Sequence, residues 1–206
     1  MFRINTSRRT DQREIMDDFD LKGFELRSTL QDLDNINKWL GGNKITLKGI
    51  ENLLKDVPKS KTIRIADIGC GNGAILRKIA KWGDNKGYNL KLFGVDANPH
   101  AIEIGEELSS KYPNLSFLNL NIFSSEFQEM EFDIILCTLT LHHFKNEEII
   151  KLLDQLYHQS TIGVVINDLQ RSKAAYVLFK AFCAVFVHNE IARKDGLISI
   201  LRGFKK

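Results

Sequence analysis

The sequence predicts an α/β protein with a doubly wound, mainly parallel sheet and an N-terminal helical extension. In the middle of the chain, short apolar runs alternate with segments of helical spacing. Before them, apolar residues recur mostly at intervals of three or four positions, as on one face of a helix. A length of 206 residues fits one main domain.

Five apolar runs have the length and composition of buried strands: residues 63–67, 90–96, 115–119, 132–138 and 161–168. Helical spacing lies between them, over residues 74–81, 99–111 and 146–158. Asn98 and Pro99 are typical of an N-cap followed by proline at the first helical position, and Pro113 follows the end of that helix. Strands alternating with helices form βαβ units, which predicts parallel strands covered on both faces.

Both ends of the chain are helical in pattern. Residues 12–55 predict two or three helices ending near Pro58, so we expect a helical segment or lid over residues 1–58 and the main domain over 59–206. Residues 172–187 predict a long apolar helix, and a short apolar run follows at 197–201.

Composition excludes several classes of protein. Hydrophobic residues make up 43% and charged residues 27%, which is ordinary globular usage, and the net charge is only +3. We expect no nucleic-acid partner, and a solvated surface for the loose group of basic residues Arg3, Arg8, Arg9 and Arg13. The apolar stretch 174–187 contains Lys180 and is shorter than the roughly 20 residues that span a bilayer, so no stable membrane insertion is expected.

Cysteine usage and the N-terminus predict a reduced, cytoplasmic setting. The three cysteines Cys70, Cys137 and Cys183 are widely spaced and form no CxxC pair, which argues against a disulfide framework or a zinc site. Residues 1–13 lack the apolar core of a secretory signal.

A glycine-rich turn follows the first predicted strand. Asp67 precedes the pattern Gly69-x-Gly71-x-Gly73, in which glycine lets the backbone bend sharply and a ligand approach closely. Asp96 ends the next strand, where a carboxylate can accept hydrogen bonds from ribose hydroxyls. The two elements indicate an adenosine-containing ligand. Asp67 repels a pyrophosphate and suits a cationic amino group, which disfavours a nicotinamide cofactor.

At these residues the sequence resembles the class I S-adenosylmethionine-dependent methyltransferases over about residues 61–168. The resemblance implies a Rossmann-like sheet of order 3-2-1-4-5 and S-adenosylmethionine as cofactor. It places Asp67 and the turn against the methionine part, and Asp96 at the ribose. Asn121 stands where the family often has Asp for the adenine amine, and Ile122 would pack on the adenine. The other expected cofactor-binding residues are Gly69, Cys70, Gly71, Asn72, Gly73, Ala97, Thr138 and Leu139.

After the fourth strand, Leu141-His142-His143 is similar to the LHH signature of small-molecule methyltransferases. Topology places these histidines beside the glycine turn, at the switch point of the sheet. Either His142 or His143 could take a proton from an acceptor, or one could hydrogen-bond locally while the other packs at the pocket floor. No metal site is expected, because adjacent histidines do not readily converge on one ion and no third ligand has a recognisable spacing. For Cys70 we expect a packing role.

Two segments have alternative interpretations. Residues 14–18 are either part of a lid over the acceptor or a solvated helix with Ile15 and Phe19 packed inward. The aromatic stripe of the C-terminal helix either lines an acceptor pocket or belongs to the core; its members are Tyr176, Phe179, Phe182 and Phe186.

The expected function is methyl transfer to an oxygen, carbon or nitrogen of an aromatic or lipid-like small molecule, by a monomer or homodimer. The alternatives are an RNA or protein methyltransferase, an NAD(P)-dependent oxidoreductase, and a non-catalytic cofactor-binding protein. The first is disfavoured because the sequence has no basic stripe and no Asn-Pro-Pro-Tyr-type signature. Relatives of this fold usually add a sixth and seventh strand, for which only residues 197–201 are available, so the chain is expected to be incomplete at its C-terminus.

Overall fold

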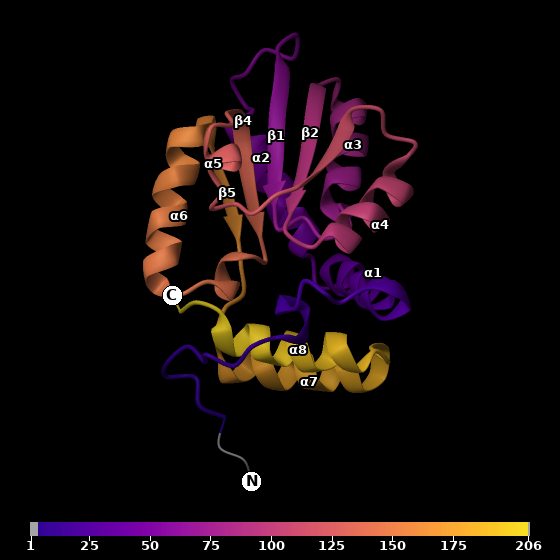
Figure 1. Ribbon diagram of the computed structural model, residues 1–206, viewed down its shortest axis with the longest axis vertical. Helices are drawn as coiled ribbons and strands as arrows, with labels where there is room; N and C mark the ends of the chain where they lie inside the picture. Colours follow the sequence, from indigo (N-terminus) through magenta and orange to yellow (C-terminus); the bar gives the residue numbers. More distant parts are fainter. Residues whose placement is uncertain (1–3, 206) are drawn as a thin grey trace.

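The computed structural model describes residues 4–205. Within this range a five-stranded sheet lies between helices, and further helices lie along one of its edges (Figure 1). The strands are β1 (Thr62–Ile68), β2 (Asn89–Asp96), β3 (Leu115–Asn119), β4 (Phe132–Thr138) and β5 (Ser160–Asn167). Their order is β3-β2-β1-β4-β5 and every neighbouring pair is parallel, which confirms the predicted fold class and strand order.

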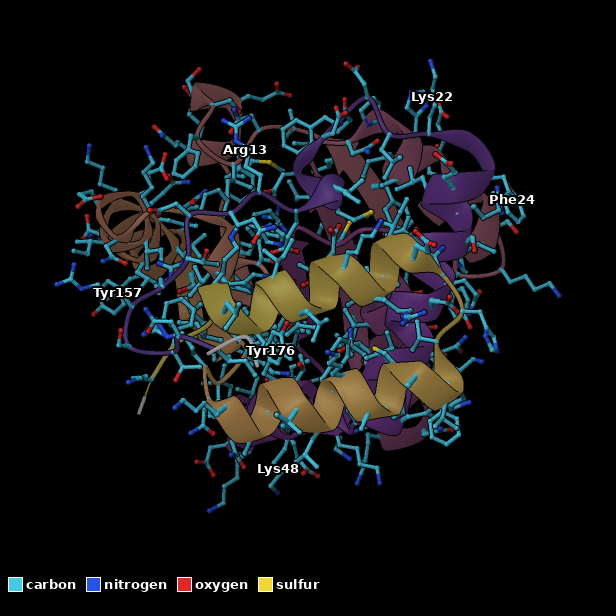
Figure 2. The ribbon with its side chains drawn as sticks, turned by 90° about the horizontal axis from the view of Figure 1, so that it is seen from below. Arg13, Lys22, Phe24, Lys48, Tyr157 and Tyr176 are labelled. Carbon is cyan, nitrogen blue, oxygen red and sulfur yellow. The ribbon has the colours of Figure 1, made fainter. Side chains whose placement is uncertain are left out.

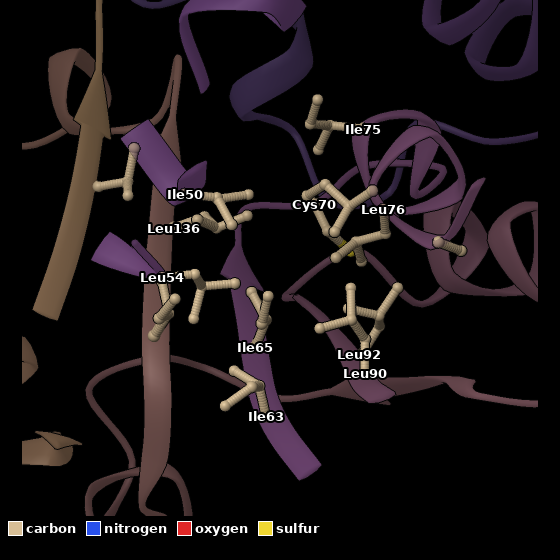
Figure 3. Close-up of a cluster of buried hydrophobic side chains, with 14 of the residues drawn as sticks. Ile50, Leu54, Ile63, Ile65, Cys70, Ile75, Leu76, Leu90, Leu92 and Leu136 are labelled. Carbon is tan, nitrogen blue, oxygen red and sulfur yellow. The ribbon is translucent and has the colours of Figure 1, made fainter. Parts of the chain in front are cut away.

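One face of the sheet is covered by α2 (Gly42–Leu53), α3 (Ala74–Lys86) and α4 (Pro99–Ser109). Their apolar side chains meet alternate residues of the strands, such as Ile63 and Ile65 of β1 (Figure 3). The N-cap of α4 is as expected, since the side chain of Asn98 accepts from the N–H groups of His100 and Ala101. The opposite face packs on α5 (Ser125–Gln128) and α6 (Asn146–Gln159).

The second N-terminal helix therefore belongs to the cover of the sheet. Ile50 of α2 and Leu54, which directly follows this helix, are fully buried in the same cluster as Ile63 and Ile65. The division of the chain at residue 58 stays a prediction.

The carboxyl ends of the strands face a separate group of helices (Figure 1). This group contains the 3₁₀ helix η1 (Ile15–Asp17), α1 (Gly23–Trp39), α7 (Lys173–Phe186) and α8 (Glu190–Arg202). Seen from below, α7 and α8 run side by side across this edge (Figure 2). Ile36 of α1 packs with Cys183 of α7 and Ala192 of α8, so segments from both ends of the chain close one edge of the sheet.

Residues 197–201, considered above as a further strand, lie in α8, so a strand assignment there is wrong. The side chain of Asn189 caps this helix by accepting from Ala192 N. Three of its five buried residues are polar: Ala192, Asp195, Ser199, Ile200 and Arg202. A buried face of this composition gives no apolar repeat at helical spacing, so the sequence pattern does not indicate a helix here.

The three cysteines are all buried thiols without a disulfide. Among the described helices, none combines the length and the apolar character needed to cross a membrane.

The contact between α2 and β5 is close enough to require glycine. A Cβ at Gly49 would lie 2.6 Å from Val165 Cγ1. We expect Gly49→Ala to reduce the free energy of unfolding by about 1–3 kcal/mol, the usual cost of overpacking a core. Chemical denaturation measures this. In a double-mutant cycle, Val165→Ala should reduce the loss of stability caused by Gly49→Ala. Helix propensity alone would make Gly49→Ala more stable than the wild type, and that result would contradict a tight contact between Gly49 and Val165.

Candidate active site

The glycine turn joins β1 to α3 in a conformation that other residues rarely adopt. Gly69 and Gly71 have φ of 67° and 52°, in the left-handed region. The N–H of Gly69 donates to Val95 O at 2.8 Å, which anchors the turn on β2. A Cβ at Gly69 would lie 2.7 Å from the Thr140 hydroxyl. The turn is therefore open to a ligand only because side chains are missing from it.

Asp96 is fixed at the end of β2 by backbone donors. Its Oδ2 accepts from Gly71 N at 2.8 Å and its Oδ1 from Asn98 N at 2.9 Å. Burial raises the pKa of Asp96, although these two hydrogen bonds partly counter it. Each carboxylate oxygen has a second lone pair, so Asp96 can still accept hydrogen bonds from a bound ligand.

Asp67 differs because one of its oxygens lacks a donor. The residue is only 2% exposed, and within residues 4–205 its Oδ1 has no hydrogen-bond partner. Burial raises its pKa well above the usual value, and the charge of Asp96 raises it further. A buried acceptor without a donor is costly, so this position suits a ligand that brings N–H groups and positive charge.

A cavity of about 1580 Å³ opens at this edge of the sheet. Among the predicted cofactor-binding residues it is lined by Asp67, Gly69, Cys70, Gly71, Asn72, Asp96, Ala97, Asn121, Ile122, Thr138 and Leu139. Gly73 is not among the lining residues; a Cβ there would lie 2.5 Å from the Phe117 ring, so Gly73 allows close packing behind the turn. The structure thus gathers residues from four strand ends around one space.

The side chain of Cys70 packs against β2. A Cβ at Gly94 would meet its Sγ at 2.9 Å, so the thiol fills a narrow gap on β2. Burial raises the pKa of Cys70 well above its usual value, and Asp96 and Asp67 raise it further. A thiol kept protonated is a poor nucleophile, which supports the packing role.

The loop after β4 carries a strained residue. Leu139 has φ of 56°, the sole positive value found for a non-glycine residue in the described chain. Its N–H donates to Asn167 O at 2.8 Å, while Thr140 Oγ1 donates to Ile68 O at 3.1 Å. Strain of this kind persists where neighbours hold the backbone, and it often marks functional loops.

His142 and His143 lie in the 3₁₀ helix η2 (Leu141–His143), and both line the cavity. Nδ1 of His142 lies 2.7 Å from Asp168 Oδ1, and Nδ1 of His143 lies 2.6 Å from Asp17 Oδ1. The side chain of His142 is only 2% exposed, whereas that of His143 is 28% exposed. His143 is therefore the histidine that a solute in the cavity can reach.

Both partner carboxylates are held in the ionised form. Burial alone would raise the pKa of Asp168, but the hydrogen bond and charge of His142 outweigh it and lower the pKa. Burial likewise acts to raise the pKa of Asp17, yet hydrogen bonds from His143 and Arg202 bring it well below its usual value. An ionised carboxylate only accepts, so Nδ1 of each histidine donates and Nε2 remains a possible proton acceptor.

Arg202 joins the histidine turn to the N-terminal segment. Its Nη1 donates to Glu14 Oε1 at 3.2 Å and to Asp17 Oδ2 at 2.7 Å, and its Nη2 donates to His143 O at 2.6 Å. Sequence reasoning missed this network. Its members are far apart in the chain and are polar, so neither local motif nor apolar spacing could reveal them.

The predicted solvated surface is wrong for Arg9. Its Nη2 donates to His142 O at 2.8 Å and to Phe144 O at 3.0 Å, and its Nε donates to Arg202 O at 2.6 Å. Arg8 and Arg13 are exposed as expected, and Arg3 lies outside the described residues. Arg9 is therefore part of the cavity wall.

In the segment 14–18, Glu14, Met16 and Asp17 line the cavity, without the inward packing considered above. Ile15 and Phe19 are 40% and 56% exposed, so that alternative is wrong for both. The segment is held by its backbone instead, because Asp195 accepts from Ile15 N and Met16 N, each at 2.8 Å. This arrangement favours the lid hypothesis.

The aromatic stripe of α7 divides between the two interpretations. Phe179 and Phe182 line the cavity, which supports the pocket alternative for these two rings. Phe182 also packs on Trp39 with ring centroids 5.9 Å apart. Phe186 is largely exposed, and Tyr176 is half-buried and is not a lining residue.

The two histidines come together more closely than the sequence suggested. Their ring centroids are 4.3 Å apart, and one ligand atom each from Glu14, His142 and His143 lie within 4.8 Å of one another. The two adjacent histidines therefore do converge, contrary to the expectation above. Both oxygens of Glu14 are already engaged, however, by Arg202 and by Ser199 Oγ. The absence of a metal stays a prediction.

Comparison with known proteins fits this geometry. Residues 65–160 match the protein family described as "Methyltransferase domain". The chain is 25% identical to the ubiquinone biosynthesis O-methyltransferase of Rickettsia felis over 134 residues, which are 63% of this chain and 50% of that protein. The corresponding protein of Rickettsia conorii is 25% identical over 133 residues, 62% of this chain and 41% of that one.

The chain thus spans about half the length of the curated relatives it matches. Among solved structures, the plantazolicin methyltransferase in complex with SAH has a TM-score of 0.62 at 24% identity, covering 87% of this chain and 64% of that one. The CMeT domain of the citrinin polyketide synthase has a TM-score of 0.54 at 19% identity, covering 73% of this chain and 36% of that one. These likenesses show the fold.

The unpaired oxygen of Asp67 gives a test by pH. Its pKa is raised in the free protein, so the ionised form that a cationic amino group requires is lost as pH falls through that raised pKa. We expect the wild-type affinity for S-adenosylhomocysteine to decrease as the pH is lowered. In Asp67→Asn the affinity should be weaker and nearly independent of pH over the same range. Calorimetric titration across a pH series measures both.

Stability supplies the matched control for this prediction. Without ligand, burial of Asp67 costs stability as pH rises from the usual aspartate pKa to the raised pKa, because over this range the unfolded chain is ionised and the folded one is not. Asp67→Asn should therefore melt above the wild type by a margin that grows over this range and is constant above it. A lower melting temperature for Asp67→Asn would mean that this carboxylate serves the fold.

Proposed function

We propose that the protein transfers a methyl group from S-adenosylmethionine to a small-molecule acceptor. The observation that carries this is the pair of buried carboxylates on either side of the glycine turn. Among the described residues, none donates to Oδ1 of Asp67, and the amino group of the methionine part would fit there. Asp96 retains acceptor capacity at the end of the adjacent strand, where ribose hydroxyls fit.

Two further lining residues complete the cofactor site in this proposal. Ile122, buried beside the cavity, would pack on the adenine, and the side-chain oxygen of Asn121 would accept from its amino group. Asn121 Oδ1 already accepts from Phe123 N at 2.9 Å, which fixes its orientation and leaves a second lone pair. Thr138 at the end of β4 and Leu139 directly after it also line the cavity and would contact the cofactor.

The bound cofactor supplies a methyl group on a sulfonium for in-line displacement. What the chain contributes is position: holding the two reactants in line provides roughly 7–11 kcal/mol of the barrier in favourable cases. A general base typically adds a factor of about 10² to 10⁴. The rigid turn and the strained β4 loop therefore matter more than proton transfer.

His143 is the base in this proposal. It is the more exposed of the two histidines, and its Nδ1 donates to ionised Asp17, which leaves Nε2 to take a proton from an acceptor hydroxyl. Asp17 is a positioning residue, itself held by Arg202. His142 is enclosed, with Nε2 at 3.6 Å from Glu14 Oε1, and supports the turn.

The acceptor fits an apolar space. Phe179 and Phe182 from α7 and Phe123 and Phe144 from the β3 and β4 loops line the cavity, which suits an aromatic or lipid-like body. The Rickettsia relatives are named O-methyltransferases, which supports oxygen as the attacking atom. A cytoplasmic location and a monomeric or homodimeric state stay predictions.

The proposed function is tested by ligand binding followed by turnover. We expect S-adenosylhomocysteine to bind in calorimetry and NAD(H) not to bind. Asp96→Asn should weaken the first by about tenfold or more, the loss expected for hydrogen bonds to a charged group. Binding of NAD(H) in its place would reject the assignment. Transfer of labelled methyl groups to small molecules of a cell extract separates an enzyme from a silent binding protein, and label in RNA or protein favours those alternatives.

The role of His143 is tested by a pH profile. His143→Gln should lower kcat by about 10² to 10⁴ while leaving S-adenosylhomocysteine affinity within a few-fold. Its rate should recover as pH rises, because an acceptor hydroxyl then ionises without a base. Exposed His158 on α6 provides the control, since His158→Gln should match the wild type. An unchanged kcat in His143→Gln would contradict the role of His143 as base and would mean that the protein acts by positioning the reactants alone.

A further inference from the structure

One buried charged residue of the cavity wall, Arg171, has no role in the proposed cofactor site. Arg171 lies in the loop between β5 and α7, lines the cavity and is only 8% exposed. Within residues 4–205, its Nε and Nη1 have no hydrogen-bond partner. A guanidinium is charged at every physiological pH, so its burial without acceptors carries a large desolvation cost.

The neighbouring arginines are satisfied, which makes Arg171 distinct. Arg202 is paired with Glu14 and Asp17. Arg9 donates to backbone carbonyls and to Asn146 Oδ1 at 2.9 Å. Arg171 adds positive charge to this group, because burial and then the charges of Arg202 and Arg171 lower the pKa of Arg9. Asp168 adds negative charge beside Arg9, so what distinguishes Arg171 within residues 4–205 is its two side-chain nitrogens without an acceptor.

Arg171 lies at the histidine end of the cavity. Arg9, whose pKa senses the charge of Arg171, donates to His142 O. Phe179, on the helix that begins directly after Ser172, lines the same space. The two carboxylates proposed to hold the cofactor, Asp67 and Asp96, lie instead at the ends of β1 and β2. Arg171 thus stands where the acceptor would be bound, beside an apolar wall.

We propose that Arg171 binds an oxyanionic group of the methyl acceptor, a carboxylate or a phosphate, so that the substrate is an apolar molecule with an anionic end. The inference rests on the proposed function and narrows its substrate class. A guanidinium donates through a planar fork that matches both groups, and charge-assisted hydrogen bonds of this kind are among the strongest in proteins. The bound anion would satisfy the donors that the chain leaves without partners.

The test uses simple probes on the whole chain. Binding of S-adenosylhomocysteine is measured first and alone, so that failure of the proposed function is recognised separately. Benzoate, phenyl phosphate and uncharged benzamide are then titrated into the protein saturated with that ligand. We expect one or both anions to bind at least about tenfold more tightly than benzamide, and the stronger of the two identifies the oxyanion.

Arg171→Met removes the charge and keeps an apolar side chain of similar length. This variant should lose the preference for anions while its affinity for S-adenosylhomocysteine stays within a few-fold. Arg8→Met, which removes an exposed charge at the cavity rim, should keep the preference. Without ligand, Arg171→Met should melt at or above the wild-type temperature, because it removes an unpaired buried charge.

Several results would overturn the proposal. No anion preference in the wild type, or the same preference in Arg171→Met, would remove Arg171 from acceptor binding. A large loss of S-adenosylhomocysteine affinity in Arg171→Met would assign it to the cofactor carboxylate. A clearly lower melting temperature of the variant, with anion binding lost only through unfolding, would make Arg171 a structural residue.

Discussion

The site depends on the guanidinium of Arg202. This single side chain contacts the N-terminal segment through Glu14 and Asp17 and the β4 loop through the backbone of both histidines. It does so from the last turn of α8. Without it, Asp17 would lose one of the donors that hold it beside His143, and Glu14 and Asp17 would lose the cation that lies between them. The geometry of the proposed base is therefore set by a residue that touches no reacting atom.

Charge is unevenly distributed along the cavity. At the strand ends, Asp67 and Asp96 concentrate negative charge in a buried space, and the orphan oxygen of Asp67 is the clearest sign of a missing cation. At the histidine end, Arg9 and Arg171 add positive charge near the ionised Asp17 and Asp168, and within residues 4–205 two nitrogens of Arg171 lack an acceptor. Both arrangements cost stability in the free protein and are retained at sites whose ligands offset them. A substrate pair with a cationic and an anionic component matches this division.

Much of the fold could be predicted from the sequence, because it is encoded by apolar pattern and short-range motifs. The bounds of β3 and β4 agree with the pattern to the residue, and the glycine turn with Asp67 and Asp96 lies where its spacing indicates. The rest depends on polar contacts between distant segments. The sequence around Arg9 and Glu14 carries no local motif for their contacts. The buried residues of α8 are mostly polar, so residues 197–201 stood out as an isolated apolar run that could be taken for a strand.

The pairing of Arg202 with Glu14 and Asp17 has a consequence for how the molecule is made. Residues 14 and 17 are synthesised some 185 positions before this partner. The sheet and its helices can assemble in between, since domains form as their residues emerge. Until α8 is made, the N-terminal segment lacks its contacts with Asp195, Ser199 and Arg202. Closure of this side of the cavity therefore follows assembly of the sheet.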